Sequence, residues 1–185
     1  MQRQLITGAK RVVLKIGSSL VASRNLGLRH DLIHQLSHDI AELKNQQHEV
    51  VLVSSGAIVA GIDKLGLKSY PQSIPLKQAA AATGQSHLVH AYEKCFQEAR
   101  QKVAQVLLTH QDLTDRKRFL NARNTLTTLI DMGVIPIINE NDTVSVDEIR
   151  FGDNDTLAGQ VAHLVDADLF VICLLYTSPS PRDRG

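Results

Sequence analysis

Cysteine is scarce in this chain of 185 residues, and its scarcity excludes one class of protein. Only Cys95 and Cys173 are present, far apart in the sequence and outside any C-x-x-C pair. Small secreted domains that depend on disulfide frameworks carry many more cysteines, so two isolated thiols favour a reducing compartment. We therefore expect a cytoplasmic protein without a disulfide framework.

Long apolar stretches are lacking as well. No run approaches the roughly 20 apolar residues that a helix needs to cross a bilayer. The first residues also lack the basic-then-apolar order of a secretory signal peptide. We expect no membrane partner from this pattern.

The chain has no excess of charge of either sign. Twenty Lys and Arg side chains are balanced by nineteen Asp and Glu, which leaves a net charge of +1. Such a chain has no overall field that would attract nucleic acid, so binding is expected from local sites. Four histidines lack the spacing of metal ligands, and we assign them no metal: His87, His90, His110 and His163.

Apolar runs that suit strands alternate along the chain with segments of helical periodicity. Strands are expected at 12–14, 50–53, 103–109, 134–138 and 169–172, and helices at 31–43, 57–65, 75–100, 116–132 and 156–165, with an interruption of the long helix at Thr83 and Gly84. This alternation predicts an α/β fold, a three-layer sandwich with a mainly parallel sheet and right-handed crossovers. We find no internal repeat and no linker.

The first two expected strands both end in turns of small residues. Lys15 is followed by a Gly-Ser-Ser turn, and the strand at 50–53 continues into Ser-Ser-Gly-Ala. In a parallel sheet these turns would lie on the same edge, where open α/β folds bind ligands. Free backbone N–H groups beside a lysine suit a phosphate. The alternatives are a solvated Lys15 beside an ordinary turn, and a Ser55 that only caps a helix.

The loop at 139–155 concentrates acidic and amide side chains between an apolar strand and a helix. Carboxylates placed so closely repel one another unless ammonium groups, a metal ion or helix-end amides accompany them. The loop therefore predicts a binding site. A solvated acidic loop is the alternative, and Asp153 and Asp155 would also stabilise the start of a helix without any ligand.

The helix expected at 75–100 contains four consecutive alanines, Ala79 to Ala82. Such small side chains allow two helices to approach closely, either within the chain or across a dimer, and we favour packing in the core of one chain. Gly61 in the preceding helix would allow the same close approach. The basic residues between 116 and 123 are interpreted as solvated or paired with acidic neighbours.

Four motifs in this order resemble the amino acid kinase family: VLKIGS at 13–18, VSSGA at 53–57, and INEND at 138–142 with GDND at 152–155. The resemblance covers about residues 10–172. The RFLNAR segment at 118–123 points to the members that phosphorylate L-glutamate. The resemblance implies transfer of the ATP γ-phosphoryl group to the side-chain carboxylate of L-glutamate, giving L-glutamyl 5-phosphate in the first step of proline biosynthesis.

The resemblance also implies roles for particular residues. Lys15 and Asp155 would be catalytic, with Lys15 beside the transferring phosphoryl group. Mg²⁺ would arrive with ATP, and no protein ligand for it is assigned. The residues implied for ATP are Lys15, Gly17 and Ser18, and those implied for L-glutamate are Ser55, Gly56, Ala57, Asp142 and Asn154.

The end of the chain departs from the family pattern. Leu174 and Leu175 stand where the family has a Thr-Asp pair that contacts the nucleotide. The residues after them have a Pro/Ser-rich composition and look similar to translated sequencing-adapter sequence. We therefore expect residues 1–172 to be the N-terminal part of an amino acid kinase domain, incomplete and inactive alone, and residues 173–185 to be a non-native tail.

Two alternatives remain at this point. One is a different family relative, such as an acetylglutamate, uridylate or aspartate kinase, although these lack the combined motifs at 138–142 and 152–155. The other is a non-catalytic module that binds an amino acid. A homo-oligomer is expected as well, and in the non-catalytic alternative it would form through the helix at 75–100.

Overall fold

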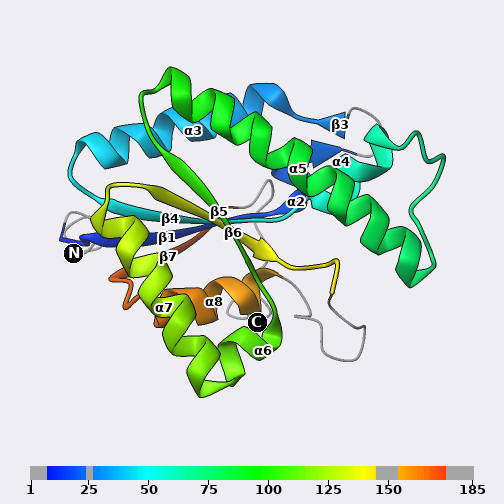
Figure 1. Cartoon of the computed structure of the whole chain (residues 1–185). Coiled ribbons are helices and arrows are strands. Elements are labelled where there is room, and N and C mark those ends of the chain that lie inside the picture. The colour runs from blue at the N-terminus through cyan, green and yellow to red at the C-terminus, as the bar shows by residue number, and fades with distance from the viewer. Residues whose placement is uncertain (1–7, 24–26, 145–153, 174–185) are drawn as a thin grey trace, which may run out of the picture.

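The computed structural model describes residues 8–23, 27–144 and 154–173 (Figure 1). Strands of these residues are β1 (Arg11–Ile16), β2 (Ala22–Ser23), β3 (Gly27–Leu28), β4 (Glu49–Ser54), β5 (Val103–Leu108), β6 (Ile135–Glu140) and β7 (Leu169–Cys173). Their helices are α2 (Ser18–Val21), α3 (His30–Asn45), α4 (Ala57–Lys64), α5 (Ile74–Glu98), α6 (His110–Thr114), α7 (Arg116–Asp131) and α8 (Asn154–Leu164).

Five of the strands form one sheet in the order β5-β6-β4-β1-β7, and every pair in it is parallel. Ile16 at the end of β1 is in register with Ser54 on one side and with Cys173 on the other. The carboxyl ends of three neighbouring strands therefore lie at one edge. A two-stranded antiparallel pair, β2 with β3, stands apart from this sheet.

Helices cover both faces of the sheet. In Figure 1, α3 and α5 lie on one face, and α7 and α8 lie on the other. Successive residues of β1 serve the two sides, because Val12 and Leu14 pack with α3 and α5 while Val13 packs with α7 and α8. Buried on both faces, the strands are continuously apolar. The predicted three-layer α/β sandwich with a mainly parallel sheet is confirmed.

Helices α4 and α5 cross closely because glycines stand at the contact. A Cβ atom on Gly61 would lie 1.8 Å from the Ala80 carbonyl oxygen, and one on Gly84 would lie 1.8 Å from that of Ala57. The expected interruption of α5 at Thr83 and Gly84 is wrong, since the helix runs unbroken through both. Gly84 allows α4 to approach α5 closely at that point and does not end the helix. The favoured packing within the chain holds for Ala80 and Ala81, which are buried, whereas Ala79 and Ala82 are exposed.

Several short elements differ from the sequence prediction. The polar stretch after β5 forms α6, because Thr109 and Asp112 make a reciprocal capping box. Strand β6 continues to Glu140, two residues past its expected end, since Asn139 and Glu140 still pair with β5. Helix α8 begins at Asn154, and the short α2 and the β2–β3 pair were not predicted from the sequence.

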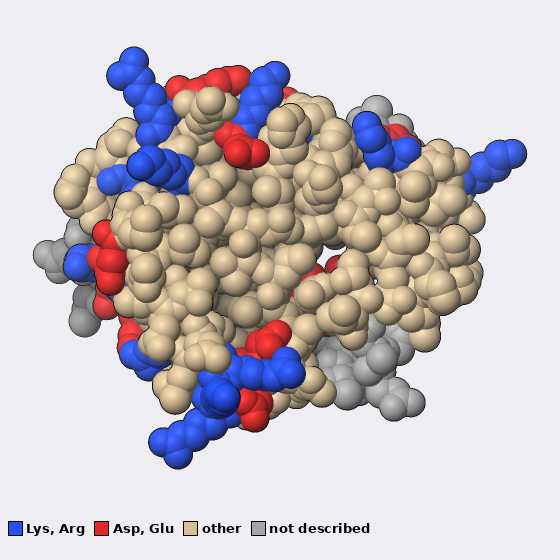
Figure 2. All heavy atoms as spheres, in the orientation of Figure 1, with Lys and Arg blue, Asp and Glu red and all other residues tan. Residues whose placement is uncertain are grey.

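Charges of both signs are scattered over the visible face of the molecule (Figure 2). In the basic segment of α7, Arg118 lies 3.1 Å from Asp112, and Arg123 pairs with Asp166. These pairs agree with the interpretation of this segment as paired with acidic neighbours. None of the helices in the described ranges is long and apolar enough to cross a membrane.

Candidate functional site

The candidate site lies at the carboxyl edge of the parallel sheet. The turns after β1 and β4 begin at Gly17 and Ser55, next to each other in register. The Ser55 N–H donates to the Ile16 carbonyl at 3.1 Å, which ties the two turns together. Helix α8 starts at the same edge with Asn154. The sheet and α8 thus gather three of the four sequence motifs here, and the fourth, at 138–142, begins in the neighbouring strand β6.

Lys15 and Asp155, the two predicted catalytic residues, form an ion pair. The Lys15 Nζ lies 2.5 Å from Asp155 Oδ1. Lys15 belongs to β1 and is only 8% exposed, so the alternative of a solvated lysine is wrong. Its ammonium group reaches the turn after β1, because a Cβ atom on Gly17 would lie 3.9 Å from Nζ. Asp155 stands in the first turn of α8, where the helix dipole also favours a carboxylate.

The turn between β4 and α4 has a backbone that requires glycine. Gly56 has φ +107°, and a Cβ atom there would lie 2.8 Å from Val21 Cγ2. Gly56 is also the N-cap of α4, and no side chain of the described segments caps that helix. The alternative that Ser55 is a helix cap is therefore wrong. In the part of the chain that the structure describes, no side chain accepts from the first-turn amides of α4, which begins at Ala57.

The Ser55 hydroxyl is instead bonded to Asn154. Asn154 Nδ2 lies 2.6 Å from Ser55 Oγ, 3.0 Å from Asn139 Oδ1 and 3.3 Å from the Ser54 carbonyl oxygen. One amide group thereby joins the ends of β4, β6 and α8. Two predicted substrate-binding residues, Ser55 and Asn154, are brought into direct contact.

Two polar residues that the sequence did not single out complete this network. Asn139 is 3% exposed, and its Nδ2 donates to Gln85 Oε1 at 2.7 Å. Gln85 comes from the middle of α5 and is 8% exposed. Asn139 stood within a recognised motif, so its position in the site could have been inferred. Gln85 gave no signal, because it follows an alanine-rich helical segment far away in the chain.

Asp142 occupies a neighbouring hollow. It follows β6 and is half-buried. The hollow is lined by Ala81, Gln85, Leu107, Glu140, Asn141, Asp142 and Thr143. Gln85 thus borders both the amide network and Asp142. Residues 145–153, which include Asp153 and most of the acidic loop, lie outside the described residues.

A buried hydroxyl pair supports the turn from behind. The hydroxyl groups of Ser54 and Tyr92 are 3.1 Å apart, and Tyr92 is fully buried in α5. Burial raises the pKa of the Tyr92 phenol well above its ordinary value, so this group stays protonated.

In the described ranges, no group of three or more His, Cys, Asp or Glu side chains is arranged to hold a metal ion.

The Lys15–Asp155 pair and the Ser55–Asn154 pair thus lie together at the carboxyl edge of an open parallel sheet, the edge at which such folds bind ligands. The family model described as "Amino acid kinase family" matches residues 10–174. The chain belongs to the amino acid kinase family.

Curated relatives make the similarity more specific. The chain is 55% identical to the glutamate 5-kinase of Teredinibacter turnerae over 174 residues, covering 94% of this chain and 46% of the relative. It is 56% identical to that of Nitrosospira multiformis, covering 95% and 48%. It is 51% identical to that of Burkholderia thailandensis, covering 99% and 50%. The chain spans about half the length of the curated relatives it matches.

Proposed function

We propose that the chain is part of an enzyme that transfers the γ-phosphoryl group of ATP to the side-chain carboxylate of L-glutamate, giving L-glutamyl 5-phosphate for proline biosynthesis. The observation that carries this proposal is the joint placement of Lys15, Asp155, Ser55 and Asn154 at one sheet edge. The identity of 51–56% to relatives named glutamate 5-kinase supports the choice of substrate.

The proposed reaction brings two anions together, so its main physical demand is the neutralisation and alignment of charge. Lys15 supplies a positive charge at the end of β1, and its ion pair with Asp155 holds the ammonium group in one direction. We assign both residues to the catalytic step. The backbone N–H groups of Gly17 and the exposed Ser18 bind ATP phosphate oxygens beside Lys15.

The acceptor side of the proposed site recognises L-glutamate by two kinds of polar group. The Ser55 hydroxyl and the uncapped N–H groups at Gly56 and Ala57 bind a carboxylate. Asp142 and Asn154 bind the ammonium group, for which oxygen acceptors are the natural partners. Both sets come from the same sheet edge, so one small amino acid can span them.

Mg²⁺ belongs to this proposal as the companion of ATP, where it offsets phosphate charge. The residues at the site fit a phosphate through Lys15, and they supply no dedicated metal cage in the described ranges.

We further propose a cytoplasmic homo-oligomer. Exposed Ile74 and Leu76 at the start of α5 favour the oligomer, because apolar side chains there can pack against a second copy. The boundary between native residues 1–172 and a foreign tail at 173–185 stays a prediction.

The proposed function is tested by thermal unfolding of this chain with and without millimolar L-glutamate, with N-acetyl-L-glutamate as the control. A ligand that binds only the folded state raises the unfolding midpoint by mass action. We expect L-glutamate to raise the midpoint and N-acetyl-L-glutamate to leave it unchanged, since acetylation removes the ammonium charge. A midpoint that rises only with N-acetyl-L-glutamate would instead favour an acetylglutamate kinase relative.

A further inference from the structure

Gln85 is a buried polar side chain in an otherwise small-residue and apolar stretch of α5. It lies 54 positions before Asn139 in the sequence, yet its Oε1 accepts a hydrogen bond of 2.7 Å from Asn139 Nδ2. A buried side-chain amide is normally found with its polar atoms hydrogen-bonded. None of the roles proposed for the reaction uses Gln85, so its contact with the site needs its own explanation.

The direction of each hydrogen bond in the network is fixed by two backbone groups. The Glu140 N–H can only donate, and it lies 2.9 Å from Asn139 Oδ1, so this oxygen is the acceptor end of the Asn139 amide. The Ser54 carbonyl oxygen can only accept, so Asn154 presents Nδ2 to it. Asn139 Nδ2 must then point to Gln85, and Gln85 must present its oxygen.

This polarity decides what the site offers to a ligand. Ser55 Oγ accepts from Asn154, which leaves the serine hydrogen available to donate elsewhere. Asn154 uses Nδ2 for all three of its contacts in the network, so Oδ1 is its remaining acceptor. A hydroxyl donor suits a carboxylate, and an amide oxygen suits an ammonium group. Both groups occur in a free amino acid.

We propose that Gln85 is a positioning residue for amino-acid binding: by accepting from Asn139, it fixes the orientation of the amide network that directs Ser55 and Asn154 toward the ligand. This inference rests on the proposed function for the identity of the ligand as L-glutamate. Gln85 itself acts through Asn139. It also borders the hollow that contains Asp142, so it connects the two parts of the proposed acceptor site.

Loss of the Gln85 oxygen would leave the buried Asn139 Nδ2 without its acceptor. The Asn139 amide would then be held only through Oδ1, by the Glu140 N–H and Asn154 Nδ2, so its plane could tilt away from its present orientation. Such a tilt would weaken the hydrogen bond from Asn154 Nδ2 to Asn139 Oδ1, and with it the hold on Ser55. The network would lose its single direction, while the backbone of the site could stay in place.

The test compares three variants of this chain by calorimetric titration with L-glutamate. Gln85→Met keeps the length of the side chain and removes the acceptor, and we expect it to weaken binding by about tenfold. Gln85→Glu keeps an acceptor oxygen at the same length, and we expect it to restore most of the binding. Gln97→Met changes an exposed glutamine of the same helix and is expected to bind like the unaltered chain.

A second measurement follows the side-chain amide resonances of Asn139 and Asn154 in ¹⁵N-labelled protein without ligand. Gln85→Met should shift both pairs of resonances, and Gln97→Met should shift neither. If the unaltered chain does not bind L-glutamate, the proposed function fails, and these resonances still decide whether Gln85 orients the network. Unmoved resonances, or a Gln85→Met chain that unfolds earlier yet binds L-glutamate normally, would overturn the inference. Gln85→Leu, which also lacks the acceptor, takes the place of Gln85→Met in both measurements if Gln85→Met does not fold.

Discussion

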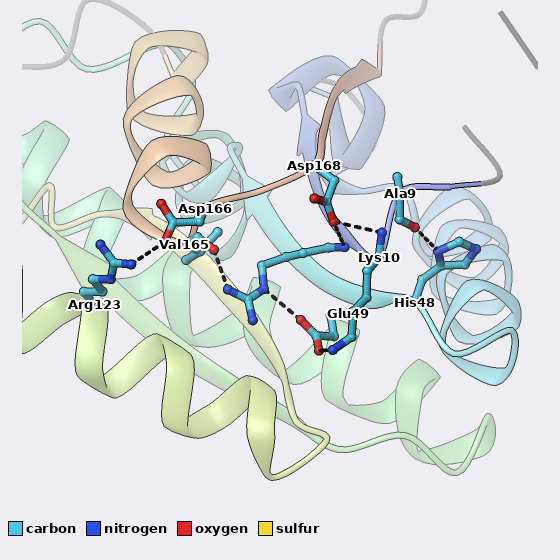
Figure 3. A network of polar contacts seen from close by, with 9 residues as sticks. Ala9, Lys10, His48, Glu49, Arg123, Val165, Asp166 and Asp168 are labelled. Atoms are coloured by element: carbon cyan, nitrogen blue, oxygen red, sulfur yellow. Dashed lines mark hydrogen bonds and ion pairs between the residues drawn. The ribbon is translucent and has the colours of Figure 1, made fainter. Parts of the chain in front are cut away.

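The two ends of strands β1, β4 and β7 both carry polar side chains, which are used in different ways. At the amino ends, Asp168 accepts from the backbone N–H groups of Lys10 and Arg11 at 2.9 and 2.7 Å (Figure 3). The Arg11 guanidinium lies 2.8 Å from Glu49 Oε2, and the Lys10 ammonium lies 3.0 Å from Glu49 Oε1. These groups satisfy one another across three strands.

At the carboxyl ends, the polar groups are held by one another but are directed outward. Asn139 and Gln85 fix Asn154, and Asn154 fixes Ser55, whose hydroxyl hydrogen is then available for a ligand. The two edges of one sheet therefore show two uses of polar side chains, and β4 takes part in both. A closed network at the amino ends ties the sheet together, and an oriented network at the carboxyl ends lies at the proposed site.

The largest effect is expected where the carboxyl-end site is supported by the crossing of α4 and α5. Gly84→Ala would place a Cβ atom 1.8 Å from the Ala57 carbonyl oxygen. Both partners are backbone, so the helices must separate, and we expect a loss of about 3 kcal/mol or more in the free energy of unfolding. Chemical denaturation measures it.

Gly159→Ala in α8 is the matched control. A Cβ atom there would have nothing within 4 Å, so the change should stabilise the chain by about 1 kcal/mol through helix propensity alone. If both substitutions changed the free energy of unfolding equally, the close crossing of α4 and α5 would not be what supports the turn after β4.

The second prediction breaks the closed network at the amino ends. Glu49→Gln removes the charge that Arg11 and Lys10 share, and it leaves the half-buried Arg11 guanidinium with a weaker partner. We expect a loss of about 1–2 kcal/mol in the free energy of unfolding. L-glutamate binding should not change, because the site is at the opposite end of the strands. A parallel loss of binding would show that the two ends are coupled.

The sequence predicted the members of the site that belong to local motifs. Lys15 lies near the end of β1 and Ser55 directly follows β4, and parallel topology is enough to bring these two strand ends together. Asn154 and Asp155 were in the same acidic loop pattern. The prediction of a parallel sheet then implied their approach, although not which atoms touch.

The sequence could not predict the contacts that depend on the exact crossing of distant elements. Gln85 meets Asn139 only because Gly61 and Gly84 let α5 pack against α4 at that depth. No local pattern marks one glutamine in an alanine-rich helix as different from its neighbours. The ion pair between Arg11 and Glu49 could not be predicted from the sequence either, since it depends on the register between β1 and β4.

The third prediction separates support of the site from its orientation. Tyr92→Phe removes one partner of the buried hydroxyl pair behind the Ser54 turn. Ser54 Oγ keeps a contact of 3.2 Å with the Ser55 carbonyl oxygen, so we expect a loss of only about 1 kcal/mol in the free energy of unfolding. L-glutamate affinity should stay within about twofold of normal, a difference of about 0.4 kcal/mol. A tenfold loss would place Tyr92 in the orienting network beside Gln85.

The last prediction concerns acid, and it again acts on the amino ends. Partial burial alone would raise the pKa of Glu49, but hydrogen bonds and charges from Lys10 and Arg11 outweigh it and lower the pKa from 4.5. Backbone hydrogen bonds from Arg11 and Lys10 lower the pKa of Asp168 from 3.8. Both carboxylates are therefore held in the charged form by the folded state.

A lowered folded-state pKa means that the unfolded chain binds the proton more readily. The stabilisation is fully present above the ordinary pKa and is lost as the pH falls through the lower folded-state value. Urea unfolding between pH 7 and pH 3 should show a constant gap between the unaltered chain and Glu49→Gln above about pH 5. Below pH 4.5 the gap should narrow, because protonation then makes the Glu49 carboxyl neutral like the glutamine. A gap that persists to pH 3 would mean that Glu49 stabilises the sheet through its shape and neutral hydrogen bonds, and that charge at the amino ends contributes little.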